Sequence, residues 1–83
     1  MPDEAVLREF ARFAISQGRL PRRDPDRTWG GPGCGTLCAV CEKPITSNQT
    51  EYEMEFGHGD FDKFHLHIQC FVAWERERTK PAS

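Results

Sequence analysis

The sequence Cys38-Ala-Val-Cys41, read together with His67-Ile-Gln-Cys70, decides how this 83-residue chain folds. Each stretch carries a pair of metal-binding side chains with two residues between them, and the 25 residues 42–66 lie between the pairs. Structural zinc sites bind the ion through four such side chains in a tetrahedron, which leaves no position for a catalytic water. The two pairs therefore predict one structural Zn2+ per chain, bound by Cys38, Cys41, His67 and Cys70.

Two further residues are alternative ligands in the same region. Cys34 lies four residues before Cys38, and His65 lies two residues before His67. With Cys34 in place of His67, the site would consist of thiolates alone. We favour His67 because it gives the second pair the same two-residue spacing as the first. Cys34 is then expected to be an exposed, oxidisable thiol between two glycines.

The cysteines also allow two interpretations without a metal. Four cysteines in a chain this short are compatible with two disulfides, as in small secreted domains. However, Met1-Pro2-Asp3-Glu4 does not resemble a secretion signal and no apolar segment follows it, so we expect a reducing, cytoplasmic environment. A thiol-redox protein needs its reactive cysteine at a helix N-terminus after a strand, and the sequence shows no such strand before Cys38.

The composition indicates a single small domain that needs additional stabilisation. With 83 residues, of which 37% are hydrophobic, the chain can bury only a modest core. A bound metal can supply the missing stability, because its binding energy becomes folding energy. No run approaches about 18 apolar residues, so we expect no transmembrane helix.

The charge distribution argues against general binding to nucleic acids. The formal net charge is −2. Residues 1–33 carry six arginines and five acidic residues, whereas residues 34–74 carry two lysines and six acidic residues. The predicted zinc-binding region is therefore acidic, and an acidic surface repels phosphate.

Residues 3–17 have the pattern of an amphipathic helix. Asp3 can cap its N-terminus and Gly18 can end it. Apolar residues recur at spacings of three and four, which predicts one buried stripe. The stripe consists of Val6, Leu7, Phe10, Phe13 and Ala14. It either packs on the zinc-binding region or docks on a partner or a second copy of the chain, and the sequence leaves both open.

Residues 19–33 are expected to be irregular, because three prolines interrupt regular backbone hydrogen bonding. The segment is either a solvated linker or a basic arm that contacts phosphate or an acidic surface. We expect Trp29 to fold back onto the core, with an exposed stacking surface as the alternative. The candidate partner-binding residues of the segment are Arg19, Arg22, Arg23, Arg27 and Trp29.

Residues 51–66 are typical of a β-hairpin. Residues 51–56 alternate between glutamates and apolar residues, which predicts a strand with its glutamates in water. A turn at 57–60 and a returning strand at 61–66 complete the hairpin.

Residues 68–78 then predict a C-terminal helix. We expect a solvated end at 75–78 and a frayed tail at 79–83. The helix should pack over the hairpin and close a small core above the zinc. This predicted core consists of Phe56, Phe64, Phe71 and Trp74.

The order of CxxC, Ile45, a hairpin and an aromatic residue before HxxCF resembles the PARP-type zinc finger of poly(ADP-ribose) polymerases and DNA ligase III. The likeness falls within residues 36–74 and implies a treble-clef fold with a zinc site in a finger that senses DNA breaks. The gap between the pairs is shorter here and the region is acidic, so DNA-break binding is not carried over. Nearly the whole chain also resembles a family of small uncharacterised bacterial zinc-binding proteins, through RLPRRxPDRTWGGPG and HxxCFxxWE. The residues that match the PARP-type pattern are Cys38, Cys41, Ile45, His67, Cys70 and Phe71.

These patterns together predict an α+β protein. Its expected segments are a helix in 1–18, an Arg/Pro/Gly linker in 19–33, a treble-clef zinc module in 34–78 and a flexible tail in 79–83. Because the zinc is structural, we expect a protein-interaction or regulatory module and not an enzyme. The alternatives are a nucleic-acid-binding finger that uses residues 19–27 with Trp29, and a thiol-redox protein.

Overall fold

A computed structural model describes residues 3–57 and 62–79 of the chain. Within these residues, the fold has two helices and one three-stranded antiparallel sheet in strand order β1-β2-β3. The predicted α+β class, hairpin strands and C-terminal helix are therefore confirmed. In chain order, the elements are α1 (Glu4–Ser16), β1 (Arg27–Pro32), β2 (Thr50–Phe56), β3 (Asp62–His67) and α2 (Ile68–Arg78).

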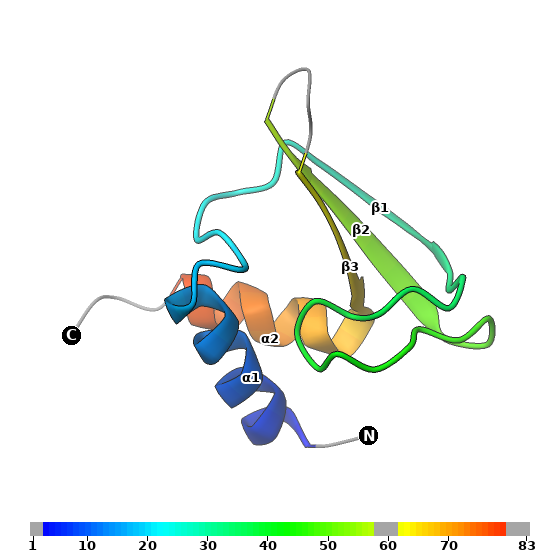
Figure 1. The fold of residues 1–83 in the computed structure, drawn as a ribbon, viewed down its shortest axis with the longest axis horizontal. Helices are drawn as coiled ribbons and strands as arrows, with labels where there is room; N and C mark the ends of the chain where they lie inside the picture. The colour runs from blue at the N-terminus through cyan, green and yellow to red at the C-terminus, as the bar shows by residue number, and fades with distance from the viewer. Residues whose placement is uncertain (1–2, 58–61, 80–83) are drawn as a thin grey trace.

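The elements form three layers, with α2 between the sheet and α1 (Figure 1). Helix α2 follows β3 directly and contacts β2 and β3, whereas α1 packs on α2. The connection between β1 and β2 lies at the end of the sheet where α2 begins (Figure 1). This connection contains residues 37–44, which we call the cysteine turn, so the layers bring that turn next to the β3–α2 junction.

The segment predicted to be an irregular linker contains the edge strand β1. Its register with β2 runs from Arg27 opposite Glu55 to Pro32 opposite Thr50. The prediction was wrong because an edge strand needs hydrogen bonds on one side only, and a proline is tolerated at its end.

The outer face of the sheet, which faces away from α2, carries the three glutamates of β2. Glu55 is buried, with one carboxylate oxygen 3.5 Å from Lys63 Nζ, and the side chain of Glu51 is only 12% exposed. The prediction that these glutamates face water was therefore wrong. Strand β1, which the sequence analysis did not predict, pairs with β2 on the side opposite to β3. The glutamates of β2 therefore have neighbouring side chains on both sides. The inward residues Met54 and Phe56 are buried as predicted.

Helix α1 begins as predicted, because Asp3 caps it by accepting a hydrogen bond from the N–H of Val6. Its buried face differs from the predicted stripe, since Phe10 and Phe13 are 40% and 58% exposed. The buried residues are Leu7, Ala11, Ala14 and Ile15. Alanines let two helices approach closely, so α1 turns its small residues toward α2 and leaves its phenylalanines outside. The helix packs on the rest of the fold, and its buried side chains belong to the same hydrophobic core as those of α2 and the sheet.

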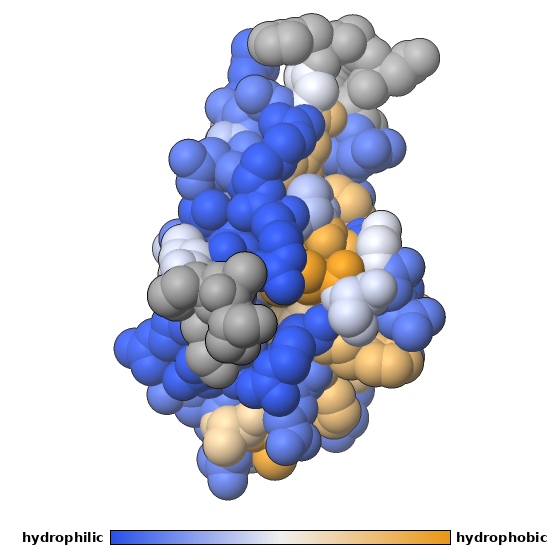
Figure 2. All heavy atoms as spheres, turned by 90° about the vertical axis from the view of Figure 1, so that its left-hand side faces the viewer, coloured by the Kyte–Doolittle hydropathy of each residue, from blue (hydrophilic) through white to orange (hydrophobic). Residues whose placement is uncertain are grey.

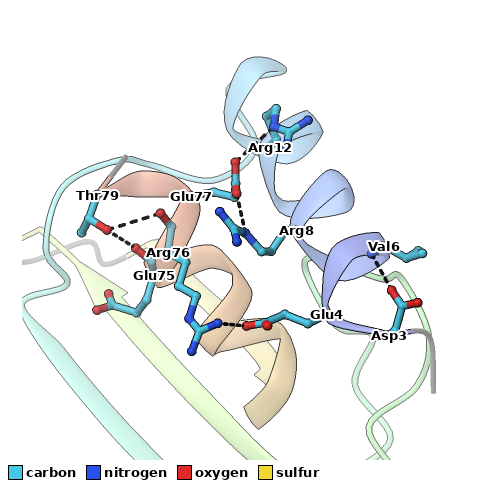
Figure 3. A network of polar contacts seen from close by, with 9 residues as sticks. All are labelled: Asp3, Glu4, Val6, Arg8, Arg12, Glu75, Arg76, Glu77 and Thr79. Carbon is cyan, nitrogen blue, oxygen red and sulfur yellow. Dashed lines mark hydrogen bonds and ion pairs between the residues drawn. The ribbon is translucent and has the colours of Figure 1, made fainter. Parts of the chain in front are cut away.

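A network of ion pairs joins α1 to α2 (Figure 3). Glu77 accepts hydrogen bonds from Arg8 Nε at 2.7 Å and from Arg12 Nε at 3.1 Å. Arg76 pairs with Glu4 at the other end of the interface. Glu77 is 4% exposed, so the prediction of a fully solvated end of α2 was wrong there. Its partners lie more than 60 residues away in the sequence, where no local pattern could reveal them.

The predicted aromatic core forms between α2 and the sheet. The ring of Trp74 is fully buried and contacts the rings of Phe56 and Phe71, with centroids 6.3 and 5.8 Å away. The Trp74 Nε1–H donates a hydrogen bond to the carbonyl of Pro21 at 3.0 Å, which ties residues 19–26 to the core. Phe64 packs against this core and is partly buried.

The face of the molecule shown in Figure 2 is mostly hydrophilic, and apolar residues are exposed on part of it. Among the described residues, Phe13 and Leu37 are the most exposed large hydrophobic ones, at 58% and 61%. Neither described helix has the length and hydrophobicity that crossing a bilayer requires. The predicted turn beyond Gly57 and the predicted tail beyond Thr79 lie outside the described residues.

Candidate metal centre

Four side chains from three parts of the chain meet at one end of the sheet. Cys38 and Cys41 belong to the cysteine turn, His67 is the last residue of β3, and Cys70 lies in the first turn of α2. Their ligand atoms all lie within 4.8 Å of one another. The Nδ1 of His67 is 3.4 Å from Cys41 Sγ and 3.9 Å from Cys70 Sγ. These four side chains are positioned to bind one metal ion.

Backbone hydrogen bonds hold the cysteine turn in a tight loop. The N–H of Cys38 donates to Lys43 O, and the N–H of Glu42 donates to Cys38 O, both at 2.9 Å. Glu42 has a φ of 61°, in the left-handed region that a side chain adopts with difficulty, because the chain must reverse there. The N–H of Ala39 donates to His65 O at 2.8 Å and joins the turn to β3. Both cysteines of the first pair are thereby held beside the second pair.

Next to the cysteine turn, the backbone at Gly33 crosses closely over the backbone at Ile45 and Thr46. A Cβ on Gly33 would collide with the backbone carbonyls of Ile45 and Thr46. Gly33 N–H donates to Gln49 O at 3.0 Å, and Gly35 N–H donates to Ile45 O at 2.8 Å. Only glycine leaves room for this crossing, because any other residue has a Cβ.

The electrostatics of the cysteines suit a cation. A hydrogen bond with Cys70 lowers the pKa of Cys38 to about 4. The same hydrogen bond, together with burial, raises the pKa of Cys70, and burial raises the pKa of Cys41. The backbone N–H of Val40 also donates to Cys38 Sγ at 3.4 Å, which favours a thiolate there. A divalent cation is the counter-charge that lets the other two thiols ionise as well.

A residue that the sequence did not single out orients the histidine. The Nε2 of His67 lies 3.1 Å from Gln49 Oε1, which also accepts the backbone N–H of Thr46 at 2.9 Å. Because Thr46 N–H can only donate, the Gln49 atom between them is the acceptor, and His67 Nε2 carries the proton. The Nδ1 lone pair is thus directed at the cysteines, as metal-binding histidines require. Gln49 lies in a polar turn, where its sequence carries no signal of this role.

The two alternative ligands lie elsewhere. Cys34 is exposed, and its Sγ is 4.0 Å from the carbonyl of Pro32. The Nδ1 of His65 lies 3.0 Å from Glu51 Oε2 on the outer face of the sheet. Among the described residues, the only group of three or more potential metal ligands is the one formed by Cys38, Cys41, His67 and Cys70.

The arginine segment is largely engaged within the molecule. Arg19 pairs with Glu42 at 3.0 Å, and Arg23 lies over the ring of Phe56, 5.0 Å from its centroid. Arg22 and Arg27 are exposed. Trp29 is 44% exposed, so the expectation that it folds onto the core was wrong. Its place in β1 turns its side chain to the outer face of the sheet, opposite Glu53.

No family model, no curated protein and no solved structure matches this chain. The likeness to PARP-type fingers therefore remains a likeness of ligand spacing. The geometry by itself shows a Cys3His cluster that can hold one metal ion.

Proposed function

We propose that this protein is a small zinc-binding interaction module of the treble-clef type, in which one Zn2+ has a structural role. The observation that carries the proposal is the closed Cys3His cluster. Cys38, His67 and Cys70 are each 4% exposed or less, so four protein ligands would surround the ion and exclude a catalytic water. A cysteine turn, a hairpin and a helix that begins at the second pair are the parts of a treble clef.

The donor set favours zinc over other metals. Three thiolates and one imidazole match structural zinc sites, whereas iron sites of this size usually have four thiolates. Native mass spectrometry of the purified protein tests this directly. We expect one Zn2+ per chain in the wild type and in Cys34→Ser, and no bound zinc in Cys70→Ser. Zinc that persists in Cys70→Ser would show that the cluster is not the binding site.

A protein partner fits the surface better than a nucleic acid does. Arg19 and Arg23 are engaged with groups of this chain, and Asp24 pairs with Arg78 at 2.5 Å. Trp29 lies on a face that carries glutamates. Few arginines are therefore left to form a basic surface, and phosphate binding depends on such surfaces.

The nucleic-acid alternative rests on Arg22, Arg27 and Trp29, which are exposed. Fluorescence polarisation with labelled single- and double-stranded DNA and RNA at low salt distinguishes the two functions. We expect no saturable binding. Saturable binding that falls steeply with added salt and is lost in a double variant, Arg22→Ala with Arg27→Ala, would favour the nucleic-acid function instead.

We also propose that the protein is not an enzyme and that Cys34 is not a redox centre. Among the described residues, the Cys34 thiol has one neighbour in hydrogen-bonding range, the carbonyl of Pro32, and a carbonyl cannot act as its base. A thiol-redox function would require that Cys34→Ser abolish disulfide reduction in a standard insulin assay. We expect the wild type and Cys34→Ser to be equally inactive there.

A further inference from the structure

A hollow of about 130 Å3 lies on the outer face of the sheet between β1 and β2. The register places Trp29 opposite Glu53 and Gly31 opposite Glu51, and residues that face each other across antiparallel strands share one face. Gly31 keeps the hollow open, because a Cβ at that position would meet nothing within 4 Å. The hollow therefore has an indole on one side and carboxylates on the other.

The charge of this hollow is unbalanced. Glu51 Oε1 is buried and has no hydrogen-bond partner among the described residues. The single imidazole of His65 faces both acidic residues, at 3.0 Å from Glu51 Oε2 and 3.8 Å from Glu53 Oε1. The described residues that line the hollow include no lysine or arginine. A buried carboxylate oxygen without a partner is destabilising, and a cation in the hollow would offset that cost.

The indole of Trp29 supplies a second feature that suits a cation. Its side chain is 44% exposed, and the described residues place no other ring and no cation over it. Of the aromatic side chains, tryptophan attracts cations most strongly over its face. An exposed indole next to two carboxylates recognises a cation that is flat or small enough to lie between them.

We infer that this hollow binds the guanidinium group of an arginine side chain on a partner protein, and the inference rests on the proposed interaction function. A guanidinium is planar, so it can stack on the indole of Trp29 while its five N–H donors reach the carboxylates of Glu51 and Glu53. A lysine ammonium is a compact charge that cannot make both contacts equally well. A metal ion does not fit, because the described residues group metal ligands only at the cysteine cluster.

The position of the hollow favours an arginine within an extended segment. Strand β1 is an edge strand, since the sheet order is β1-β2-β3. An extended peptide can add to such an edge through its backbone while alternate side chains fill pockets on one face. The hollow lies beside this edge and would take one side chain of the added segment.

The test is a titration of the zinc-loaded, full-length protein, followed by two-dimensional 1H–15N NMR. The probes are N-acetyl-arginine amide, N-acetyl-lysine amide and N-acetyl-citrulline amide, the last of which is a neutral analogue of the first. We expect saturable shifts of the Trp29 indole N–H and of the Gly31 and Glu53 amides with the arginine probe. Lysine should bind more weakly, and citrulline should leave these signals unchanged.

Two variants test the two halves of the site. Trp29→Ala and Glu51→Gln should each weaken arginine binding about threefold to thirtyfold, because each removes one of the two attractive contacts. Glu9→Gln, at an exposed position on α1, is the matched control and should bind like the wild type. If Glu51→Gln fails to fold, Trp29→Ala with Glu53→Gln takes its place.

The outcomes separate this inference from the proposed function. Zinc content and circular dichroism are recorded for every sample first. A folded, zinc-loaded protein that ignores arginine, or that responds equally to citrulline, overturns the arginine site and leaves the zinc module intact. A protein without zinc would remove the basis of both.

Discussion

The Nε2–H of His67 donates a hydrogen bond to Gln49 Oε1 at 3.1 Å, and the same oxygen accepts the N–H of Thr46. This relationship joins the turn before β2 to the end of β3. It fixes both the tautomer and the ring orientation of the histidine, so that Nδ1 faces the three cysteines. The metal centre therefore extends one residue beyond the four side chains that would touch the ion.

The first prediction concerns Gln49. Gln49→Ala should weaken zinc affinity about 10–100-fold, because loss of an outer hydrogen-bond partner frees the histidine ring. Competition with a chromophoric chelator measures the affinity. Gln69→Ala is the control, since Gln69 is exposed and adjacent to Cys70 in the chain. Equal affinities for both variants would contradict the role given to Gln49.

The second prediction concerns protons released by the metal. At pH 7 the Cys38 thiol, with a pKa of about 4, is ionised, whereas the raised pKa values of Cys41 and Cys70 keep those thiols protonated. Zinc binding to this folded arrangement should therefore release about two protons, whereas binding to a chain that is unfolded without the metal should release about three, because unperturbed thiols with a pKa of about 8.5 are protonated at pH 7. In both cases acidification should expel the ion. Calorimetry in buffers of different ionisation enthalpy counts these protons, with Cys34→Ser as the control. A count near zero would mean that the thiols do not bind as thiolates.

The third prediction concerns the close crossing of the backbone at Gly33 with the backbone at Ile45 and Thr46. Gly33→Ala should lower the free energy of unfolding by about 1–3 kcal/mol, because its Cβ would force two backbone segments apart. Gly31→Ala, two residues earlier and in open space, should change it by less than about 0.5 kcal/mol. Urea denaturation of the zinc-loaded proteins compares them. Similar effects at both positions would argue against the close crossing.

The fourth prediction concerns the interface between the helices. Glu77→Gln should lower the free energy of unfolding by about 1–3 kcal/mol, because Glu77 is 4% exposed and charged hydrogen bonds from Arg8 and Arg12 would be weakened. Glu9→Gln, on the exposed side of α1, should have little effect. A Glu77→Gln variant as stable as Glu9→Gln would show that the ion pairs do not stabilise the interface.

The sequence predicted the features that arise from local patterns. The two-residue spacing within each pair selected the four side chains that the fold brings together, although 25 residues, 42–66, separate the pairs. The alternation of residues 51–56 predicted β2, and the capping residue Asp3 predicted the start of α1. Such signals lie within a few residues of one another, so they can be recognised without the rest of the chain.

The features that the sequence missed depend on distant partners. Strand β1 forms because it can hydrogen-bond to the edge of β2, and its one proline and two glycines are atypical of a strand sequence. The helical spacing of Phe10 and Phe13 predicted burial, but the close packing of α1 on α2 buries the small residues Ala11 and Ala14 instead. Glu77 has the sequence context of a solvated helix end, and only the arrangement of the two helices shows that it is buried.

The most direct test of the central claim, that one zinc ion holds this fold together, is removal and return of the metal under circular dichroism. Purified protein is treated with excess chelator and then given one equivalent of Zn2+, while far-ultraviolet ellipticity and zinc content are followed together. We expect the helical signal to fall as zinc leaves and to recover at one ion per chain. A fold that keeps its full signal after complete removal of the metal would contradict the structural role given to Cys38, Cys41, His67 and Cys70.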